Sequence, residues 1–146
     1  ETGIAYGISS AYILQALHEN DKGTLYSIDN VFKPWESHEM IGNAIPKNLQ
    51  NRWKLTVGTS SEKLEKIFQS IEKADIFLHD SLHTYKNMLL EFQTAWPFIK
   101  NNGFLLSDDI GDNNAFLEFY LANEGHPILL KNTKNMETTL GILRKN

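Results

Sequence analysis

Short apolar runs alternate with amphipathic stretches along the chain of 146 residues. Compact apolar runs at 25–28, 53–57, 75–79 and 104–107 each precede Asp or Gly, a pattern typical of strands buried on both faces of a parallel sheet. Apolar residues at helical spacing lie between these runs. They predict one helix capped by Ser9 or Ser10 and another capped by Ser60 or Ser61.

Further helical patterns lie later in the chain. One long helix is predicted over 84–100, with a kink at Pro97, and a shorter one around 116–121. The stretch 37–49 shows a weaker helical pattern that contains Pro46. These elements predict an α/β fold with a doubly wound sheet.

The pattern changes after Gly125. Two strand-like runs, 127–130 and 138–143, are separated by turn residues and not by a helix, which predicts an antiparallel pair at the end of a mostly parallel sheet. The length predicts one domain over 1–146. Because Glu1 already lies within a motif, we expect an N-terminal segment and the start of the first strand to be missing.

Composition narrows the functional classes. The net charge of −4 argues against a nucleic-acid partner, which needs a basic surface. The chain has no Cys residue and no apolar run long enough for a membrane span, so we expect a cytoplasmic protein without disulfides. The expected partner is a small-molecule substrate, and a homo-oligomer stays open.

The first loop carries a candidate nucleotide site. Gly3 and Gly7 stand in the sequence Glu-Thr-Gly-Ile-Ala-Tyr-Gly-Ile-Ser of residues 1–9, between a first strand and the first helix. Glycines here let a ligand approach the backbone, at the sheet edge where α/β proteins bind ligands. Asp29, after the next strand, can accept hydrogen bonds from both hydroxyls of a ribose, although it can equally cap a turn.

A second candidate site follows the later strands. Asp80, Asp108 and Asp109 should leave neighbouring parallel strands at one edge, where a hard cation such as Mg²⁺ or Mn²⁺ could hold them ionised. His83 lies three residues after Asp80, and if a helix begins there both share one face, which puts a general base beside the cation. The alternative is that the acids are helix N-caps.

Both regions resemble class I S-adenosylmethionine-dependent methyltransferases, with their Rossmann-like fold. The Glu-x-Gly-x-Ala-x-Gly spacing is similar to the first motif of that family, with Ala5 in place of a Gly. Residues 75–110 look like the core of the small-molecule O-methyltransferases, among them metal-dependent macrolide sugar O-methyltransferases. Asn101-Asn102-Gly103 stands where Pro-Gly-Gly is usual.

The resemblance implies roles for individual residues. S-adenosylmethionine would be the cofactor, His83 the base, and Asp80, Asp108 and Asp109 the metal ligands. The residues that we expect to contact the cofactor are Glu1, Gly3, Ala5, Gly7, Ser9, Asp29, Gly58, Thr59 and Asp80. Two alternatives remain: an NAD(P)-dependent oxidoreductase, although a G-x-G-x-x-G motif is missing, and a non-catalytic S-adenosylmethionine-binding domain.

Overall fold

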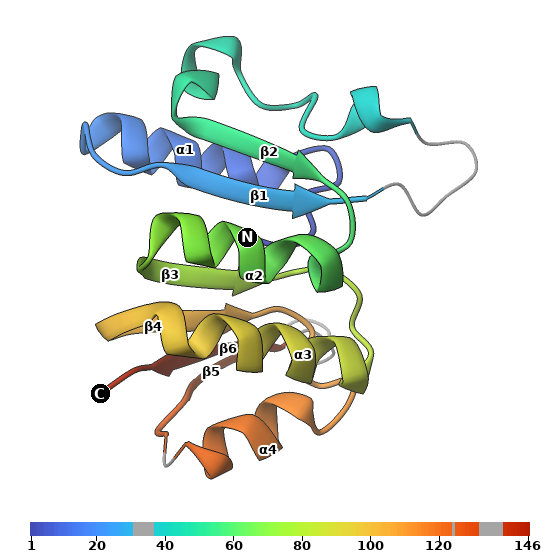
Figure 1. Cartoon of the computed structure of the whole chain (residues 1–146), viewed down its shortest axis with the longest axis vertical. Coiled ribbons are helices and arrows are strands. Elements are labelled where there is room, and N and C mark those ends of the chain that lie inside the picture. The colour runs from blue at the N-terminus through green and yellow to red at the C-terminus, as the bar shows by residue number, and fades with distance from the viewer. Residues whose placement is uncertain (31–36, 124, 132–138) are drawn as a thin grey trace. The chain divides into compact units, whose positions relative to one another are not determined.

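The structure is a computed structural model, and it describes residues 1–30, 37–123, 125–131 and 139–146 (Figure 1). The chain divides into two compact units, Glu1–Lys63 and Leu64–Asn146. Within the described ranges, none of the helices combines the length and apolar character that a membrane crossing needs.

The first unit is built on a small parallel sheet. Strands β1 (Leu25–Asp29) and β2 (Trp53–Val57) pair in parallel. The backbone of Thr2 forms an isolated parallel bridge with Ile28 on β1, at the place where the sequence predicted the tail of a first strand. Helix α1 (Ile8–Glu19) contacts β1 and buries Leu14 in an apolar cluster with Leu25, Ile45 and Leu49.

Two local predictions for the first unit are wrong. Helix α1 begins at Ile8 after Gly7, whose φ is 87°, so Ser9 and Ser10 lie inside the helix and neither caps it. The stretch 37–49 forms no α-helix. The short 3₁₀ segment η1 (His38–Met40) lies within it, a second, η2 (Lys47–Arg52), begins at its end, and Pro46, which lacks an N–H group, immediately precedes η2.

The second unit holds a mixed sheet in the order β3-β4-β6-β5. Strands β3 and β4 pair in parallel, whereas β6 is antiparallel to both β4 and β5, which confirms the predicted C-terminal antiparallel pair. Thr138, the expected first residue of the last strand, lies outside the described residues. The strands are β3 (Ala74–His79), β4 (Ile99–Ser107), β5 (Ile128–Lys131) and β6 (Thr139–Arg144).

Three helices accompany these strands: α2 (Ser60–Ile71), which crosses the boundary between the units, α3 (Tyr85–Ala95) and α4 (Ala115–Ala122). Helix α2 begins at Ser60, so Ser60 and Ser61 lie in its first turn. Helix α3 contacts β3 and α4, and its Phe92 ring packs edge-on against Phe116 of α4 at 6.1 Å between centroids. Aromatic packing therefore joins α3 and α4 into one layer.

The join between α3 and β4 differs from the sequence prediction. The helix ends at Ala95, a 3₁₀ turn η3 (Trp96–Phe98) contains Pro97, and β4 begins at Ile99, before the expected residue 104. The register of β3 against β4 shifts between Ala74 and Ile76. Because the apolar signal is broken by polar residues 100–102, the early part of this strand was not visible in the sequence.

Gly103 generates a stability prediction. It is buried, and a Cβ atom there would lie 2.6 Å from the Asp75 carbonyl oxygen and 2.9 Å from the Lys100 carbonyl oxygen. Backbone oxygens cannot move aside as a flexible side chain can, so we expect Gly103→Ala to lower the free energy of unfolding by about 1–3 kcal/mol, the scale of overpacking. Urea unfolding measures this. The control Asn101→Ala, at an exposed neighbour, should change it by less than about 0.5 kcal/mol, and equal effects would contradict the prediction.

Candidate functional site

The loop from the first strand to α1 is wound through left-handed backbone conformations. Gly3, Ala5 and Gly7 have φ angles of 79°, 47° and 87°. A Cβ atom on Gly7 would lie 2.9 Å from the Gly42 Cα atom, so the residue must be Gly for this close approach. Ala5 is the residue that departs from the all-glycine pattern, and it nevertheless adopts the left-handed conformation.

The Asp29 carboxylate holds this loop. Its Oδ2 atom accepts hydrogen bonds from the backbone N–H groups of Ile4 and Ala5, both at 2.7 Å, and its Oδ1 atom accepts one from Asn30 at 2.6 Å. A carboxylate offers about four lone-pair positions, so these bonds leave room for one further donor. Asp29 is thus both the partner of the strained loop and a candidate acceptor for a ligand hydroxyl.

The Glu1 side chain forms hydrogen bonds with the elements that flank the loop. Its Oε1 atom accepts hydrogen bonds from Ser10 Oγ at 2.5 Å and Ser27 Oγ at 2.7 Å, and Trp53 Nε1 donates to Ser27 Oγ at 2.8 Å. Ser10 and Ser27 are fully buried. The Glu1 carboxylate therefore links the first strand, β1, β2 and α1, a structural function that the sequence did not reveal.

The other predicted cofactor residues of this unit lie at the same strand ends. Gly58 N–H donates to the Asp29 carbonyl oxygen at 2.8 Å, which joins the ends of β1 and β2. Thr59 Oγ1 lies 3.1 Å from Ser61 Oγ at the start of α2, and Ser9 is half-buried in the first turn of α1. The structure therefore places the carboxyl ends of β1 and β2 next to each other, as the sequence predicted.

The sequence did not reveal one segment that contacts the loop, residues 42–44. The backbone N–H groups of Gly42 and Ala44 donate to the carbonyl oxygens of Ala5 and Tyr6, both at 2.9 Å. Gly42 has a φ of 71°, and a Cβ atom there would lie 2.3 Å from the Trp53 ring. The Gly at position 42 was the available signal, but the weak helical pattern around it suggested a different structure.

The second candidate site lies in the second unit, after β3 and β4. The parallel register places His79 opposite Ser107, and Asp108 N–H donates to the His79 carbonyl oxygen at 3.0 Å. Asp80 and Asp108, the next residues on the two strands, therefore leave neighbouring strand ends, as the sequence predicted.

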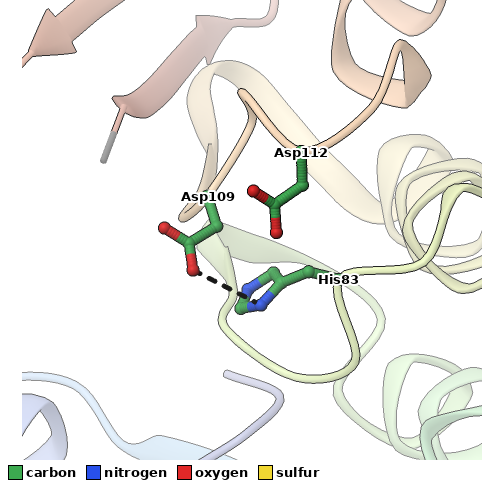
Figure 2. Close-up of side chains that lie close together, drawn as sticks. All are labelled: His83, Asp109 and Asp112. Carbon is green, nitrogen blue, oxygen red and sulfur yellow. Dashed lines mark ion pairs between the residues drawn. The ribbon is translucent and has the colours of Figure 1, made fainter. Parts of the chain in front are cut away.

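His83 lies among carboxylates. Its Nε2 atom is 3.8 Å from Asp80 Oδ1 and its Nδ1 atom is 3.6 Å from Asp109 Oδ2. Figure 2 shows the side chains of Asp109 and Asp112 on the loop after β4, next to the His83 ring. One ligand atom from each of these three residues can be chosen so that all lie within 4.8 Å of one another, a spacing that suits a shared metal ion.

This group differs in two respects from the predicted one. It includes Asp112, to which the sequence assigned no role, and His83, which was predicted as the base, whereas the predicted ligands Asp80 and Asp108 are not members. In addition, residues 80–84 precede α3, so the i, i+3 helical face that we expected for Asp80 and His83 does not exist. The loop itself brings the two side chains together. Asp112 was hidden because its position depends on the turn after Asp109, whose φ is 47°.

The carboxylates of the loop after β4 repel one another. Burial raises the pKa of the Asp109 carboxyl above its ordinary value, the nearby charges of Asp108 and Asp112 raise it further, and His83 opposes them. The ionised form of Asp109 is therefore disfavoured when the protein binds no cation. A divalent cation beside these carboxylates would remove the repulsion.

The fold matches solved methyltransferase structures. CalS11, a TDP-rhamnose 3'-O-methyltransferase of calicheamicin biosynthesis, is 13% identical with a TM-score of 0.70, over 98% of this chain and 69% of its own. An O-methyltransferase from Bacillus cereus in complex with SAH is 13% identical with a TM-score of 0.68, over 99% and 72%. An rRNA methylase from Streptococcus thermophilus is 14% identical with a TM-score of 0.68, over 98% and 82%.

These matches define the class of the fold: a Rossmann-like α/β fold of the class I methyltransferases. The profile of a family described as a methyltransferase domain matches residues 1–110, and the chain belongs to this family. It is an enzyme of the S-adenosylmethionine-dependent methyltransferase type. None of the curated proteins matches the sequence.

The charge of Asp109 generates the second prediction. We expect Asp109→Asn to raise the melting temperature at about pH 7 without metal, because a carboxyl whose pKa is raised by folding destabilises the protein once it is ionised. The gain should shrink as the pH falls toward the ordinary value of 3.8, where the wild-type carboxyl is also neutral. Thermal unfolding across this pH range measures the difference.

The matched control is Asp75→Asn. Asp75 is exposed and pairs with Lys100 at 2.7 Å, so its removal should give no gain at neutral pH. A lower melting temperature for Asp109→Asn at about pH 7 would show that the Asp109 carboxylate stabilises the protein without a metal ion, contrary to the argument.

Proposed function

We propose that the enzyme transfers a methyl group from S-adenosylmethionine to a hydroxyl of a small molecule or sugar. The observation that carries this proposal is the His83 imidazole held beside the Asp80 and Asp109 carboxylates at a strand end. Two of the structural neighbours are named O-methyltransferases, one of them for TDP-rhamnose, which supports a hydroxyl acceptor. The rRNA methylase neighbour acts on a nucleic acid, but the net charge of −4 argues against that acceptor here.

The loop of the first unit fits the methyl donor. Gly3, Ala5 and Gly7 would let the donor lie close to the backbone, and Asp29 retains acceptor capacity for a ribose hydroxyl. The Gly58 N–H group donates a hydrogen bond to the Asp29 carbonyl oxygen, and Thr59 follows Gly58 in the chain. We assign the cofactor contacts to these residues, together with Ser9 and, from the family resemblance, Glu1 and Asp80.

The acidic group of the second unit fits a divalent cation. The carboxylates near His83 form an all-oxygen donor set suited to a hard cation such as Mg²⁺ or Mn²⁺. We propose Asp109 and Asp112 as ligands, and Asp80 and Asp108 as the further ligands implied by the resemblance. When bound, the cation would lower the pKa of the acceptor hydroxyl and orient it.

His83 is the proposed base. Nδ1 faces Asp109 and Nε2 faces Asp80, and a neutral imidazole with its proton on one of these nitrogens has a lone pair on the other. That lone pair takes the proton of the acceptor hydroxyl. The acceptor oxygen then bonds to the methyl carbon, and the electron pair of the broken C–S bond stays on sulfur. Neighbouring carboxylates stabilise the imidazolium that results.

The cofactor assignment predicts an effect of Asp29. Removing the carboxylate in Asp29→Ala should weaken S-adenosylhomocysteine binding by about 1–3 kcal/mol, the scale of hydrogen bonds to a charged group. Calorimetry with S-adenosylhomocysteine measures this, and NAD and NADP should not raise the melting temperature. Asp29→Asn keeps the volume and Glu19→Gln is an exposed control on α1. Unchanged affinity in both Asp29 variants would remove Asp29 from the cofactor site.

The base assignment predicts an effect on turnover. With a panel of catechols and sugar nucleotides as acceptors, His83→Ala should lower turnover by about 10²–10⁴-fold, the usual range for a general base. S-adenosylhomocysteine affinity should stay unchanged, because the predicted cofactor loop does not include His83. Chelation should abolish turnover and Mn²⁺ should restore it.

His83 could instead act as a metal ligand, and Mn²⁺ binding separates the two roles. If His83 is the base, His83→Ala retains Mn²⁺ affinity while turnover falls. A parallel loss of Mn²⁺ affinity and turnover would identify His83 as a ligand and overturn its assignment as the base.

A further inference from the structure

A fully buried carboxylate lies behind the His83 loop and takes no part in the proposed reaction. Glu91 on α3 and His79 at the end of β3 are both completely buried. Glu91 Oε2 lies 2.6 Å from His79 Nδ1, and Glu91 Oε1 accepts hydrogen bonds from Ser81 Oγ at 2.7 Å and Asn87 Nδ2 at 3.1 Å. A buried acid of this kind is rare and is tolerated only when its hydrogen bonds are made.

The residues that contact Glu91 adjoin the loop that carries the proposed site. Ser81 lies between Asp80 and His83, and His79 immediately precedes Asp80. Asn87 adds bonds from its Nδ2 atom to Leu82 O at 3.0 Å and to Ser81 Oγ at 3.1 Å. Since Asn87 and Glu91 are four residues apart, they lie on one face of α3. Asn87 and Glu91, on one face of α3, therefore fix the two residues that flank Asp80, namely His79 and Ser81.

His83 is held from two further directions. The ring of His79 packs edge-on against the ring of His83, with centroids 5.2 Å apart and an interplanar angle of 88°. Within the described part of the chain, His79 Nε2 is buried and has no hydrogen-bond partner, so the contact with Glu91 is the polar contact that orients this ring. On the other side, Asn113 Nδ2 donates to the His83 carbonyl oxygen at 3.1 Å.

We propose that Glu91 is a positioning residue, which acts through Ser81, Asn87 and His79 to set the places of Asp80 and His83. This inference rests on the proposed function, because it assigns Glu91 a role in that reaction. Stability alone does not explain the carboxylate, since replacement of a buried ionic group by an apolar residue of similar volume is often neutral or stabilising. Outer partners of this kind typically change metal affinity or activity by about 10–100-fold when they are removed.

The test compares Glu91→Leu, which removes every bond to the loop, with Glu91→Gln, which keeps the volume and one acceptor. The measured quantities are the His83 ring resonances by NMR, Mn²⁺ affinity, S-adenosylhomocysteine affinity, and kcat and KM for the donor. We expect shifted His83 resonances, and a fall of about 10–100-fold in Mn²⁺ affinity or kcat. KM for the donor and S-adenosylhomocysteine affinity should change less than Mn²⁺ affinity or kcat, because Asp80 is the one assigned cofactor contact that Glu91 positions, and Glu91→Gln should recover part of the loss.

Two controls separate positioning from general destabilisation. Ile99→Val removes one methylene from a buried β4 residue away from the loop, and Thr94→Ala changes α3 one turn after Glu91. Neither should move the His83 resonances. Should Glu91→Leu fail to fold, Ser81→Ala and Asn87→Ala remove individual bonds and should give smaller changes of the same kind.

The outcomes distinguish this inference from the proposed function. Wild-type His83 resonances, Mn²⁺ affinity and kcat in folded Glu91→Leu would overturn the positioning role. Absence of methyl transfer by the wild-type enzyme to every acceptor of the panel would overturn the proposed function, and normal turnover in His83→Ala would overturn the role of His83 as base. Shifted His83 resonances in Glu91→Leu would still support the geometric role of Glu91 in that case, because the resonances do not depend on catalysis.

Discussion

The parallel pairing of β3 with β4 is the constraint on which the second candidate site depends. The register that sets His79 opposite Ser107 also sets where both strands end, and the bond from Asp108 N–H to the His79 carbonyl oxygen extends the pairing by one residue. A slip of one residue would turn the His79 side chain to the other face of the sheet. His79 could not then reach Glu91, and the loop that carries Asp80 and His83 would lose its anchor.

The first unit depends on one carboxylate in a comparable way. Backbone in the left-handed region is unfavourable for a residue with a Cβ atom, yet Ala5 has a φ of 47°. The bond from Ala5 N–H to Asp29 compensates for this conformation, and the neighbouring Ile4 N–H binds the same oxygen. A single acid after β1 thus supports a loop that departs from the usual glycine pattern at its middle position.

The sequence predicted those features of the fold that the local pattern of apolar and polar residues determines. Apolar runs located the strands, and Asp or Gly after each run located the strand ends where both candidate sites lie. Features that depend on backbone conformation were less accessible: Gly7 in place of a Ser cap at α1, or the early start of β4 at Ile99. The proposed catalytic roles remain predictions, because spacing alone does not distinguish a ligand from a helix cap.

Buried polar contacts between distant segments were not predictable at all. Glu91 lies between Met88 and Phe92 in a helical pattern. A polar residue at such a position is expected on the exposed face of the helix, but Glu91 is fully buried. Its contact with His79 forms only when α3 packs against β3, and no local pattern in the sequence indicates it. Asp112 was missed for the same reason, since a turn and not a periodic element brings it near His83.

The two acids beside His83's loop differ in a way that separates support from chemistry. Glu91 is buried, and Ser81, Asn87 and His79 contact its oxygens, so its hydrogen-bonding capacity is met within the protein. Asp109 is partly exposed, and its partial burial, together with repulsion from Asp108 and Asp112, raises its pKa. A satisfied carboxylate gains little from a cation, whereas a repelled carboxylate gains much. The surroundings of His83 therefore combine an acid on α3 that is suited to hold structure with acids after β4 that are suited to bind a metal ion.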